Sequence, residues 1–216
     1  MELPLFPLNT VLFPGAMLPL HIFEERYKLM IARCIEERRP FGVLLVRKGH
    51  EVGDAAEPFD VGTTAHIARV DELEEGKINL VCLGGKRFRT VRVVSEEPYL
   101  TGEVEFLSST SADDSKAREL SDDAGSLFAE YVRLYLAMSN QWARSVEMPG
   151  EPDGLADFIG ARLGVTPQVK QRLLEELSAR TRLALEVQIL GEAIREMTPR
   201  VGEARIMRWH GFAVMN

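Results

Sequence analysis

Four prolines interrupt the apolar segment with which the chain begins. The segment LPLFPLNTVLFPGAMLPLHIF spans residues 3–23 and has prolines at positions 4, 7, 14 and 19. Proline lacks a backbone N–H, so it limits how far strand pairing can run and cannot lie inside a helix without cost. We therefore expect short extended pieces, LPL, VLF and LPLHIF, with Pro14 and Gly15 forming the turn between two of them.

This apolar segment does not have the pattern of a targeting signal. A secretory signal needs a basic start, an uninterrupted apolar core and a small-residue cleavage site. Here residue 2 is Glu2, and the first basic residue is Arg26. No other stretch approaches the roughly 18 uncharged apolar residues of a membrane helix. We expect a soluble, cytoplasmic protein without a membrane partner.

Charge and cysteine content exclude further classes. The chain of 216 residues has a formal net charge of −7, which argues against a general nucleic-acid binder. The two cysteines, Cys34 and Cys82, stand alone in the apolar contexts MIARCIEE and INLVCLGG. Neither has the spacing of a metal site, so we expect buried free thiols in a reducing compartment.

The first half of the chain is typical of β-structure with one helix. In EERYKLMIARCIEERR, residues Tyr27, Met30, Ile31 and Cys34 fall at helical spacing, and Pro40 ends the helix. Apolar stretches of strand length follow, separated by the turn-like sequences EEG, GG and SEEP: FGVLLVRKG, GTTAHIARVDEL, KINLVCLGG, KRFRTVRVV and LTGEVEFL. Successive antiparallel strands with tight turns favour a small barrel or sandwich.

The composition changes after Leu107. The polar sequence SSTSADDSKARELSDD leads into an amphipathic helix, and LADFIGARLG and TPQVKQRLLEEL begin further helices. The segment around Thr166 and Pro167 combines an N-cap residue with a proline at the first helical position. We predict a β-barrel subdomain over 1–110, a helical bundle over 111–200 and a C-terminal tail over 201–216.

The predicted tail has large apolar side chains without clear periodicity, namely Trp209, Phe212 and Met215. Two arrangements would remove these side chains from solvent: contact with a second copy of the chain in a homo-oligomer, or packing of the tail back onto the same chain.

Motifs of catalysis are not found in the sequence. Both GK dipeptides fail the phosphate-loop pattern, and HIFEE from His21 to Glu25 lacks the second histidine of an inverted zinc motif. No GxSxG elbow occurs, although a hydrolase site formed by distant residues stays open. We expect no enzyme activity, no cofactor and no metal.

One basic cluster could bind an anion. The strand GGKRFRTVR places Lys86, Arg87, Arg89 and Arg92 around Phe88, a pattern compatible with RNA backbone contacts and base stacking. Acidic residues in neighbouring loops could pair with these cations instead: Asp71, Glu72, Glu74, Glu75, Glu96 and Glu97. RNA or small-ligand binding is therefore the alternative function.

The order of several motifs resembles the amino-terminal, substrate-binding domain family of Lon protease. The matching segments are LPLFPLNTVLFPGAMLPLHIFEERY, FGVLLV, VGTTAHIARV, LGGKRFRTV and the later helical segment from LADFIGARLG to LALEVQILGEAI. The resemblance covers roughly residues 1–200. It implies an α+β fold, a PUA-like β pseudobarrel, mostly antiparallel, with about six strands and one helix, followed by a helical bundle.

The resemblance also implies a role in binding polypeptides. The ATPase and Ser-Lys peptidase modules of the full protease are not expected within these 216 residues. The implied function is a non-catalytic module that binds unfolded polypeptide or a partner protein. Such binding needs exposed apolar surface or an accessible strand edge. The candidate residues are Pro14, Gly15, Met17 and Pro19, the strand starts Gly62 and Thr63, and a polar rim of Arg69 and Arg87.

Overall fold

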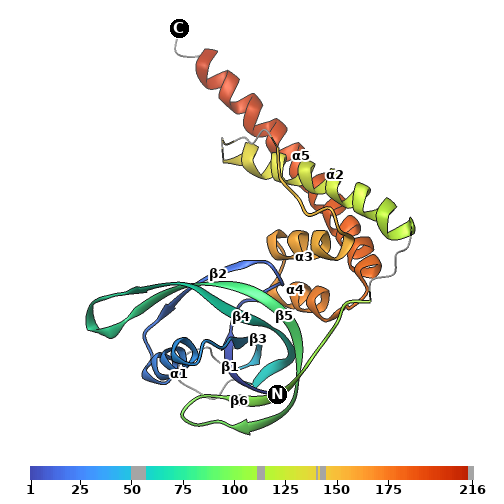
Figure 1. Cartoon of the computed structure of the whole chain (residues 1–216). Coiled ribbons are helices and arrows are strands. Elements are labelled where there is room, and N and C mark those ends of the chain that lie inside the picture. The colour runs from blue at the N-terminus through green and yellow to red at the C-terminus, as the bar shows by residue number, and fades with distance from the viewer. Residues whose placement is uncertain (50–56, 111–114, 140, 142–144, 214–216) are drawn as a thin grey trace. The chain divides into compact units, whose positions relative to one another are not determined.

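The computed structural model describes residues 1–49, 57–110, 115–139, 141 and 145–213, without the side chains of Glu75 and of residues 202–213. The chain divides into two compact units (Figure 1). The barrel unit comprises 1–110 and 160–177, and the helical unit comprises 111–159 and 178–216. The prediction from the sequence assigned residues 160–177 to the helical bundle, whereas in the structure this segment belongs to the same unit as the β-sheet.

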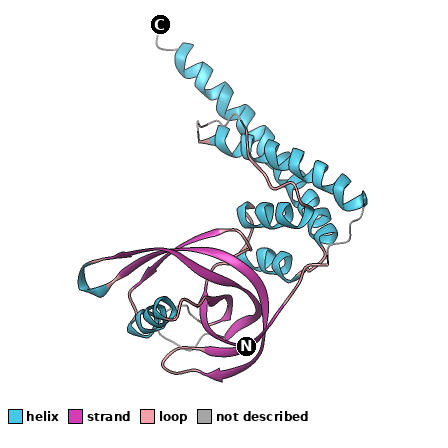
Figure 2. Cartoon of the chain, in the orientation of Figure 1, coloured by secondary structure: helices cyan, strands magenta, loops and turns pink. Residues whose placement is uncertain are grey.

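Six strands form the sheet of the barrel unit (Figure 2). They are β1 (Glu2–Leu8), β2 (Met17–Ile22), β3 (Phe41–Lys48), β4 (Glu57–Glu72), β5 (Ile78–Ser95) and β6 (Thr101–Phe106). Helix α1 (Glu25–Glu36) lies between β2 and β3, and a short 3-10 turn (Glu74–Gly76) joins β4 to β5. Helix α4 (Pro167–Glu175) completes the unit.

The pairing of the strands closes a barrel. The strand order is β2-β5-β4-β3-β1-β6, and an additional pairing joins β5 to β6. Strands β1, β3, β4, β5 and β6 therefore form a ring, and β2 lies outside it as an addition to β5. The β1–β3 pair is parallel, and the other pairs are antiparallel. The predicted α+β fold with six mostly antiparallel strands is confirmed, and α4 joins α1 in the barrel unit, for which one helix was predicted.

Strand β5 corrects one detail of the sequence interpretation. Gly84 and Gly85 were expected to turn the chain between two strands, but they lie inside the continuous strand β5. A Cβ atom at Gly84 would collide with the carbonyl oxygen of Phe13. Gly84 thus allows close approach of the Phe13 backbone, near the point where one edge of β5 stops pairing with β2 and begins to pair with β6.

The larger core lies between α1 and the inner face of the sheet. Tyr27, Met30, Ile31 and Cys34, which the helical spacing singled out, are all buried there. The partly buried side chains of β2 and its neighbours pack against this core: Leu18, Leu20, Ile67 and Ile78. The helix therefore fixes the inner face of β2 and leaves the opposite face of that strand to solvent.

The helical unit contains α2 (Ser115–Met138), most of α3 (Pro152–Arg162) and α5 (Ala179–Ala213). Helix α5 lies beside α2 (Figure 1). Arg182 is fully buried and forms ion pairs with Asp153 and Asp157. The backbone of α5 continues as helix to Ala213. The side chains of Trp209, Phe212 and Met215 lie outside the described residues, as does His50.

Among the residues that the structure describes, no helix is both long and apolar enough to span a bilayer.

Candidate functional site

Strand β2 is an open edge of the sheet. Each of its residues from Met17 to Ile22 pairs with β5, from Leu83 to Ile78, and no second partner strand is present among the described residues. An unpaired strand edge presents a row of backbone donors and acceptors that another extended chain can use. The β2 edge is therefore the first candidate for polypeptide contact.

The hydrogen-bond pattern shows which backbone groups face outward. The Gly84 amide donates to the Ala16 carbonyl over 2.8 Å. Because alternate residues of an antiparallel ladder bond to the same neighbour, Leu18 and Leu20 direct their backbone groups toward β5. The backbone groups of Met17, Pro19 and His21 then face the open side. Proline at position 19 fits this phase, because its missing N–H is not needed for pairing with β5.

The solvent face of β2, β5 and β4 forms a continuous surface, which we call the outer face. Registered residues of neighbouring strands have their side chains on the same side of the sheet. The outer face consists of three rows: Met17, Leu83 and His66; Pro19, Val81 and Arg69; His21, Asn79 and Asp71. Met17 is 70% exposed and Leu83 is 45% exposed, so the first row offers apolar surface.

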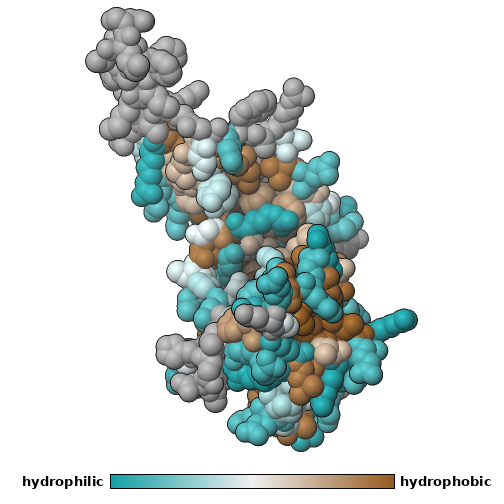
Figure 3. Space-filling model, turned by 90° about the vertical axis from the view of Figure 1, so that its left-hand side faces the viewer, coloured by the Kyte–Doolittle hydropathy of each residue, from teal (hydrophilic) through white to brown (hydrophobic). Residues whose placement is uncertain are grey.

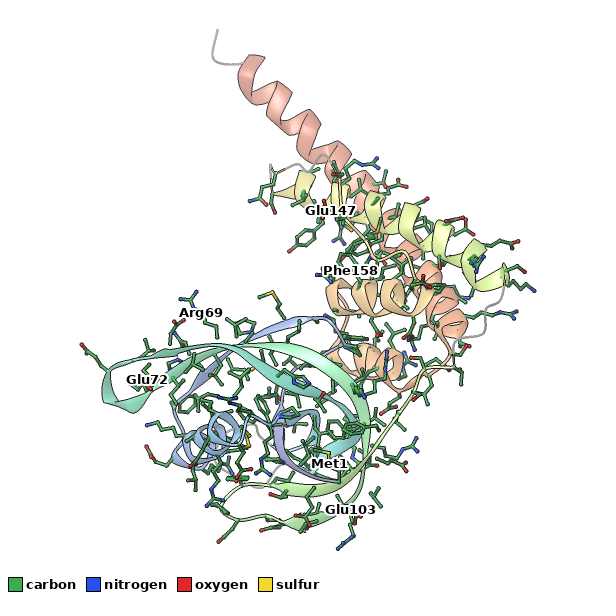
Figure 4. The ribbon with its side chains drawn as sticks, in the orientation of Figure 1. Met1, Arg69, Glu72, Glu103, Glu147 and Phe158 are labelled. Carbon is green, nitrogen blue, oxygen red and sulfur yellow. The ribbon has the colours of Figure 1, made fainter. Side chains whose placement is uncertain are left out.

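Polar groups border this apolar surface at its far end. The His21 Nδ1 atom lies 2.8 Å from Asn79 Oδ1, and Arg69 Nε lies 2.9 Å from a carboxylate oxygen of Asp71. Figure 4 shows Arg69 on the outside of the β4 ribbon. Figure 3 shows hydrophobic surface on the barrel unit bordered by hydrophilic side chains. The combination is typical of a binding surface with an apolar centre and a polar rim.

A pocket of about 320 Å³ lies beside β2. Aromatic and aliphatic side chains from β1 and α1, including Phe6, Leu8 and Tyr27, form its wall together with the residues of β2. Phe23, which follows β2, is 47% exposed and also lines the pocket. The open edge thus lies between the outer face and an apolar pocket.

The predicted site residues divide into two groups. Met17, Pro19 and Arg69 lie on the outer face, and Pro14 and Gly15 form the turn that leads into β2, with a φ of +71° at Gly15. Gly62, Thr63 and Arg87 are buried instead. The structure brings the first group together around β2, and the second group lies apart from that surface.

Arg87 illustrates why the second group is buried. Its side chain is 4% exposed, and its Nε atom donates to the Leu174 carbonyl of α4 over 3.0 Å. Gln171 of the same helix donates to the Val61 carbonyl over 3.0 Å. A Cβ atom at Gly62 would collide with the carbonyl oxygen of Val43. Arg87 thus connects the sheet to α4, and Gly62 allows β3 and β4 to pack closely.

Two other members of the basic cluster are paired with acids, and the third lies over an aromatic ring. Arg92 Nε lies 2.6 Å from a carboxylate oxygen of Glu103, and Arg89 lies 3.3 Å from Glu105. The partners come from β6, not from the acidic loops that the sequence suggested. Lys86 lies 5.6 Å from the ring centre of Phe106. This arrangement favours an ion-paired strand surface over phosphate contacts.

One cysteine and one histidine share a cleft, but their chemistry does not favour catalysis. Cys34 and His66 both line a cleft at the end of α1. Burial raises the pKa of the Cys34 thiol to about 11, so the reactive thiolate is scarce at neutral pH. Among the described residues, no group of three or more His, Cys, Asp or Glu side chains is arranged to hold a metal ion.

Sequence reasoning missed several contributors to the site. Val81, Leu83 and His66 belong to the outer face only because β5 pairs with both β2 and β4. Their distance in the chain from Met17 hides this relation. A usable signal was present in Pro19, since a proline within a strand pattern indicates an edge.

Comparison with known protein families identifies a relation over most of the chain. The model of the ATP-dependent protease La (LON) substrate-binding domain matches residues 2–192. The Lon protease of Anaeromyxobacter dehalogenans is 31% identical over 207 residues, which are 94% of this chain and 25% of that protein. Lon protease 2 of Myxococcus xanthus gives the same identity and coverage. The chain therefore spans about a quarter of the length of these relatives.

Solved structures show the same relation. The crystal structure of a Lon N-terminal domain protein from Xanthomonas campestris has 26% sequence identity and a TM-score of 0.64, covering 86% of this chain and 96% of that one. The N-terminal domain of a Mycobacterium avium complex Lon protease has 18% identity and a TM-score of 0.66, covering 88% and 98%. The second likeness concerns the fold alone.

Proposed function

Because the chain belongs to the family of ATP-dependent protease La (LON) substrate-binding domains, we propose that it is a non-catalytic module that binds extended polypeptide along β2. The proposed ligand is an unfolded polypeptide or an unstructured segment of a partner protein. The proposed setting is the cytoplasm.

The observation that carries this proposal is the open backbone edge of β2. Met17 and His21 each offer an N–H and a carbonyl group on the open side, and Pro19 offers a carbonyl. Backbone hydrogen bonds give affinity without demanding one sequence, as recognition of many unfolded chains requires.

The surroundings of the edge suggest which side chains are favoured. Side chains of an added strand alternate between the two faces of the sheet. One set would lie beside Met17 and Pro19 on the outer face, and the other set would lie over the pocket lined by Phe6, Leu8 and Tyr27. Both regions offer apolar surface, so extended segments rich in apolar residues are the expected ligands.

The test uses two substitutions at His21. His21→Ala removes the imidazole but keeps the outward N–H, whereas His21→Pro removes the N–H as well. Pairing with β5 should survive, because Leu20 and Ile22 carry the bonds to that strand. We expect His21→Pro to bind a reduced and alkylated, permanently unfolded model protein several-fold more weakly than His21→Ala, which corresponds to about 1 kcal/mol. Fluorescence anisotropy with the labelled model protein measures the affinities.

A second substitution tests the outer face independently. Met17→Lys places a charge on the most exposed apolar side chain of β2 and should also weaken binding. Arg92→Ala, on the distant β5–β6 pair, serves as the control and should leave the affinity unchanged. Equal affinities of the two His21 variants would refute pairing along the edge, and no binding by the unaltered chain would refute the proposed function itself.

A further inference from the structure

A second open edge lies in the barrel unit, on the other side of the same three-stranded ladder. The pairing of β4 with β3 ends at Ala65, so residues 66–72 of β4 pair with β5 alone. An irregularity between Ile67 and Arg69 leaves Ala68 without a register partner on β5. This part of β4 borders a cleft of about 350 Å³, whose other wall is the end of α1.

The cleft combines an apolar lining with cationic side chains. Ile35, Ile67 and Val70 contribute apolar surface, and two arginines at the end of α1 contribute charge: Arg38 and Arg39. Two adjacent arginines at one cleft contrast with the formal charge of −7 of the whole chain. Local positive charge beside apolar surface is complementary to a ligand that is apolar and carries an anionic group.

Arg39 has an acidic neighbour but keeps donors for a ligand. Its Nε atom lies 2.8 Å from a carboxylate oxygen of Glu37. A guanidinium group has five N–H donors, and this contact is made through Nε. The terminal nitrogens are suited to hold a carboxylate through two parallel hydrogen bonds.

Arg38 occupies a backbone position that normally suits glycine. The Arg39 amide donates to the Cys34 carbonyl over 3.0 Å, and the Arg38 amide donates to the Ile35 carbonyl over 3.2 Å. This pattern is the Schellman motif at a helix end. In this motif the residue just past the helix, here Arg38, has a left-handed backbone conformation. Arg38 has a φ of +50°, which is costly for a residue with a Cβ atom. This left-handed position places Arg38 at the rim of the cleft.

We propose that this cleft binds the free C-terminal carboxylate of a polypeptide that ends in an apolar residue. Arg38, with Arg39 beside it, holds the carboxylate, and Ile35, Ile67 and Val70 contact the terminal side chain. The inference rests on the proposed function, since it assigns a second subsite for the same class of ligand.

The size and composition of the cleft favour a chain terminus over other anions. A terminal residue carries its carboxylate and its side chain on the same Cα atom, so one residue satisfies both parts of a small cleft. An internal aspartate or glutamate would need a second residue to supply the apolar group.

The experiment compares two peptides that differ only at the last carboxyl group. Both have the same unstructured sequence and end in leucine, one with a free carboxylate and the other with an amide. We expect the free acid to bind the full chain about tenfold more tightly, as charge-assisted hydrogen bonds provide. A third peptide has the terminal amide and an internal aspartate, and it should bind like the plain amide.

Substitutions then locate the effect. Arg38→Gly removes the guanidinium group and places at φ +50° the residue that tolerates it best, so the variant should fold normally. It should bind the acid and the amide equally. Arg92→Ala removes a similarly exposed arginine elsewhere in the barrel unit and should keep the tenfold difference.

The outcomes separate this inference from the proposed function. Equal binding of acid and amide by the unaltered chain overturns the terminal-carboxylate site but leaves polypeptide binding intact. Tight binding of the amide with internal aspartate shows an acidic side-chain site and overturns the proposal. Failure of all three peptides and of the unfolded model protein to bind overturns both.

Discussion

Cys34 and Cys82 show how single residues respond to the core of the barrel unit. Both thiols are buried and free, as their apolar sequence contexts predicted. Burial raises the pKa of each thiol from its ordinary value of 9.0 to about 11, because the charged thiolate loses its hydration in the core. Ionisation of either thiol therefore favours the unfolded state over the folded state.

This pKa difference predicts a loss of stability at high pH. Between about pH 9 and pH 11, the folded state holds more protons on these thiols than the unfolded state does, so the free energy of unfolding falls as pH rises. The double variant Cys34→Ala/Cys82→Ala lacks these thiols and should show a smaller decline. Urea unfolding of the unaltered chain and of the double variant at pH 7, 9 and 10 measures the decline in the free energy of unfolding. Parallel declines in the two proteins would contradict the assignment to the cysteines.

Residue-scale prediction succeeded where the immediate sequence context decides the environment. The cysteines lie among apolar neighbours, and the spacing of Tyr27 and Met30 already indicated one buried helix face. Arg87 lies in an equally local pattern, a basic strand, but its environment is set by Leu174, which is 87 positions away in the chain. No property of the strand itself encodes that contact.

At the scale of elements, helix α4 begins as its sequence predicts. Thr166 has an extended backbone, its hydroxyl accepts from the Val169 amide over 3.4 Å, and Pro167 is the first helical residue. N-cap signals are readable because the capping residue and its partner are only three positions apart. The cap sets where α4 starts, and thereby where Gln171 and Leu174 face the sheet.

Removal of this cap should weaken the barrel unit. Thr166→Ala leaves the Val169 amide without its side-chain acceptor, so we expect a loss of about 1 kcal/mol in the free energy of unfolding. Thr166→Ser keeps the hydroxyl and should lose much less. Chemical denaturation followed by circular dichroism compares the three proteins. An equal loss in both variants would assign the effect to the threonine methyl group instead of the cap.

Strand β5 shows the limit of local signals for elements. A Gly-Gly pair between two apolar stretches has the pattern of a turn, yet Gly84 and Gly85 lie within one strand of 18 residues. The reason is tertiary, since the Phe13 carbonyl occupies the space that a side chain at Gly84 would need. Because one β5 strand serves both β2 and β6, the open edge of β2 could not be derived from the sequence pattern alone.

At the scale of the whole molecule, the barrel unit is built from two separate parts of the chain. Residues 160–177 return to residues 1–110 after most of α3 has joined the helical unit. Hydrogen bonds connect the two parts of the barrel unit, among them those from Arg87 to Leu174, from Gln171 to Val61, and from the Thr110 amide to the Leu177 carbonyl. The sequence pattern marks the change from strands to helices near residue 110, but it does not show which helix belongs with the sheet.

This arrangement predicts the behaviour of a fragment that ends at residue 110. Such a fragment would lose the hydrogen bond from the buried Arg87 side chain to the Leu174 carbonyl, and the Val61 carbonyl would lose its bond from Gln171. The loss of a partner of a buried charged group and of a second buried hydrogen bond should cost at least about 2 kcal/mol. Thermal unfolding of the fragment should therefore begin well below that of the barrel unit in the complete chain.

Addition of the missing helix should reverse this loss. A synthetic peptide of residues 160–177 should bind the folded fragment and not the unfolded one. It should therefore raise the melting temperature of the fragment as its concentration increases. The same peptide with Gln171→Ala and Leu174→Asp serves as the matched control, because it removes one hydrogen bond to the sheet and replaces a buried leucine by a charged residue. If the fragment melts like the complete barrel unit and neither peptide shifts it, residues 1–110 form the folding unit by themselves. A shift by the native peptide alone would establish that the sheet and α4 fold together.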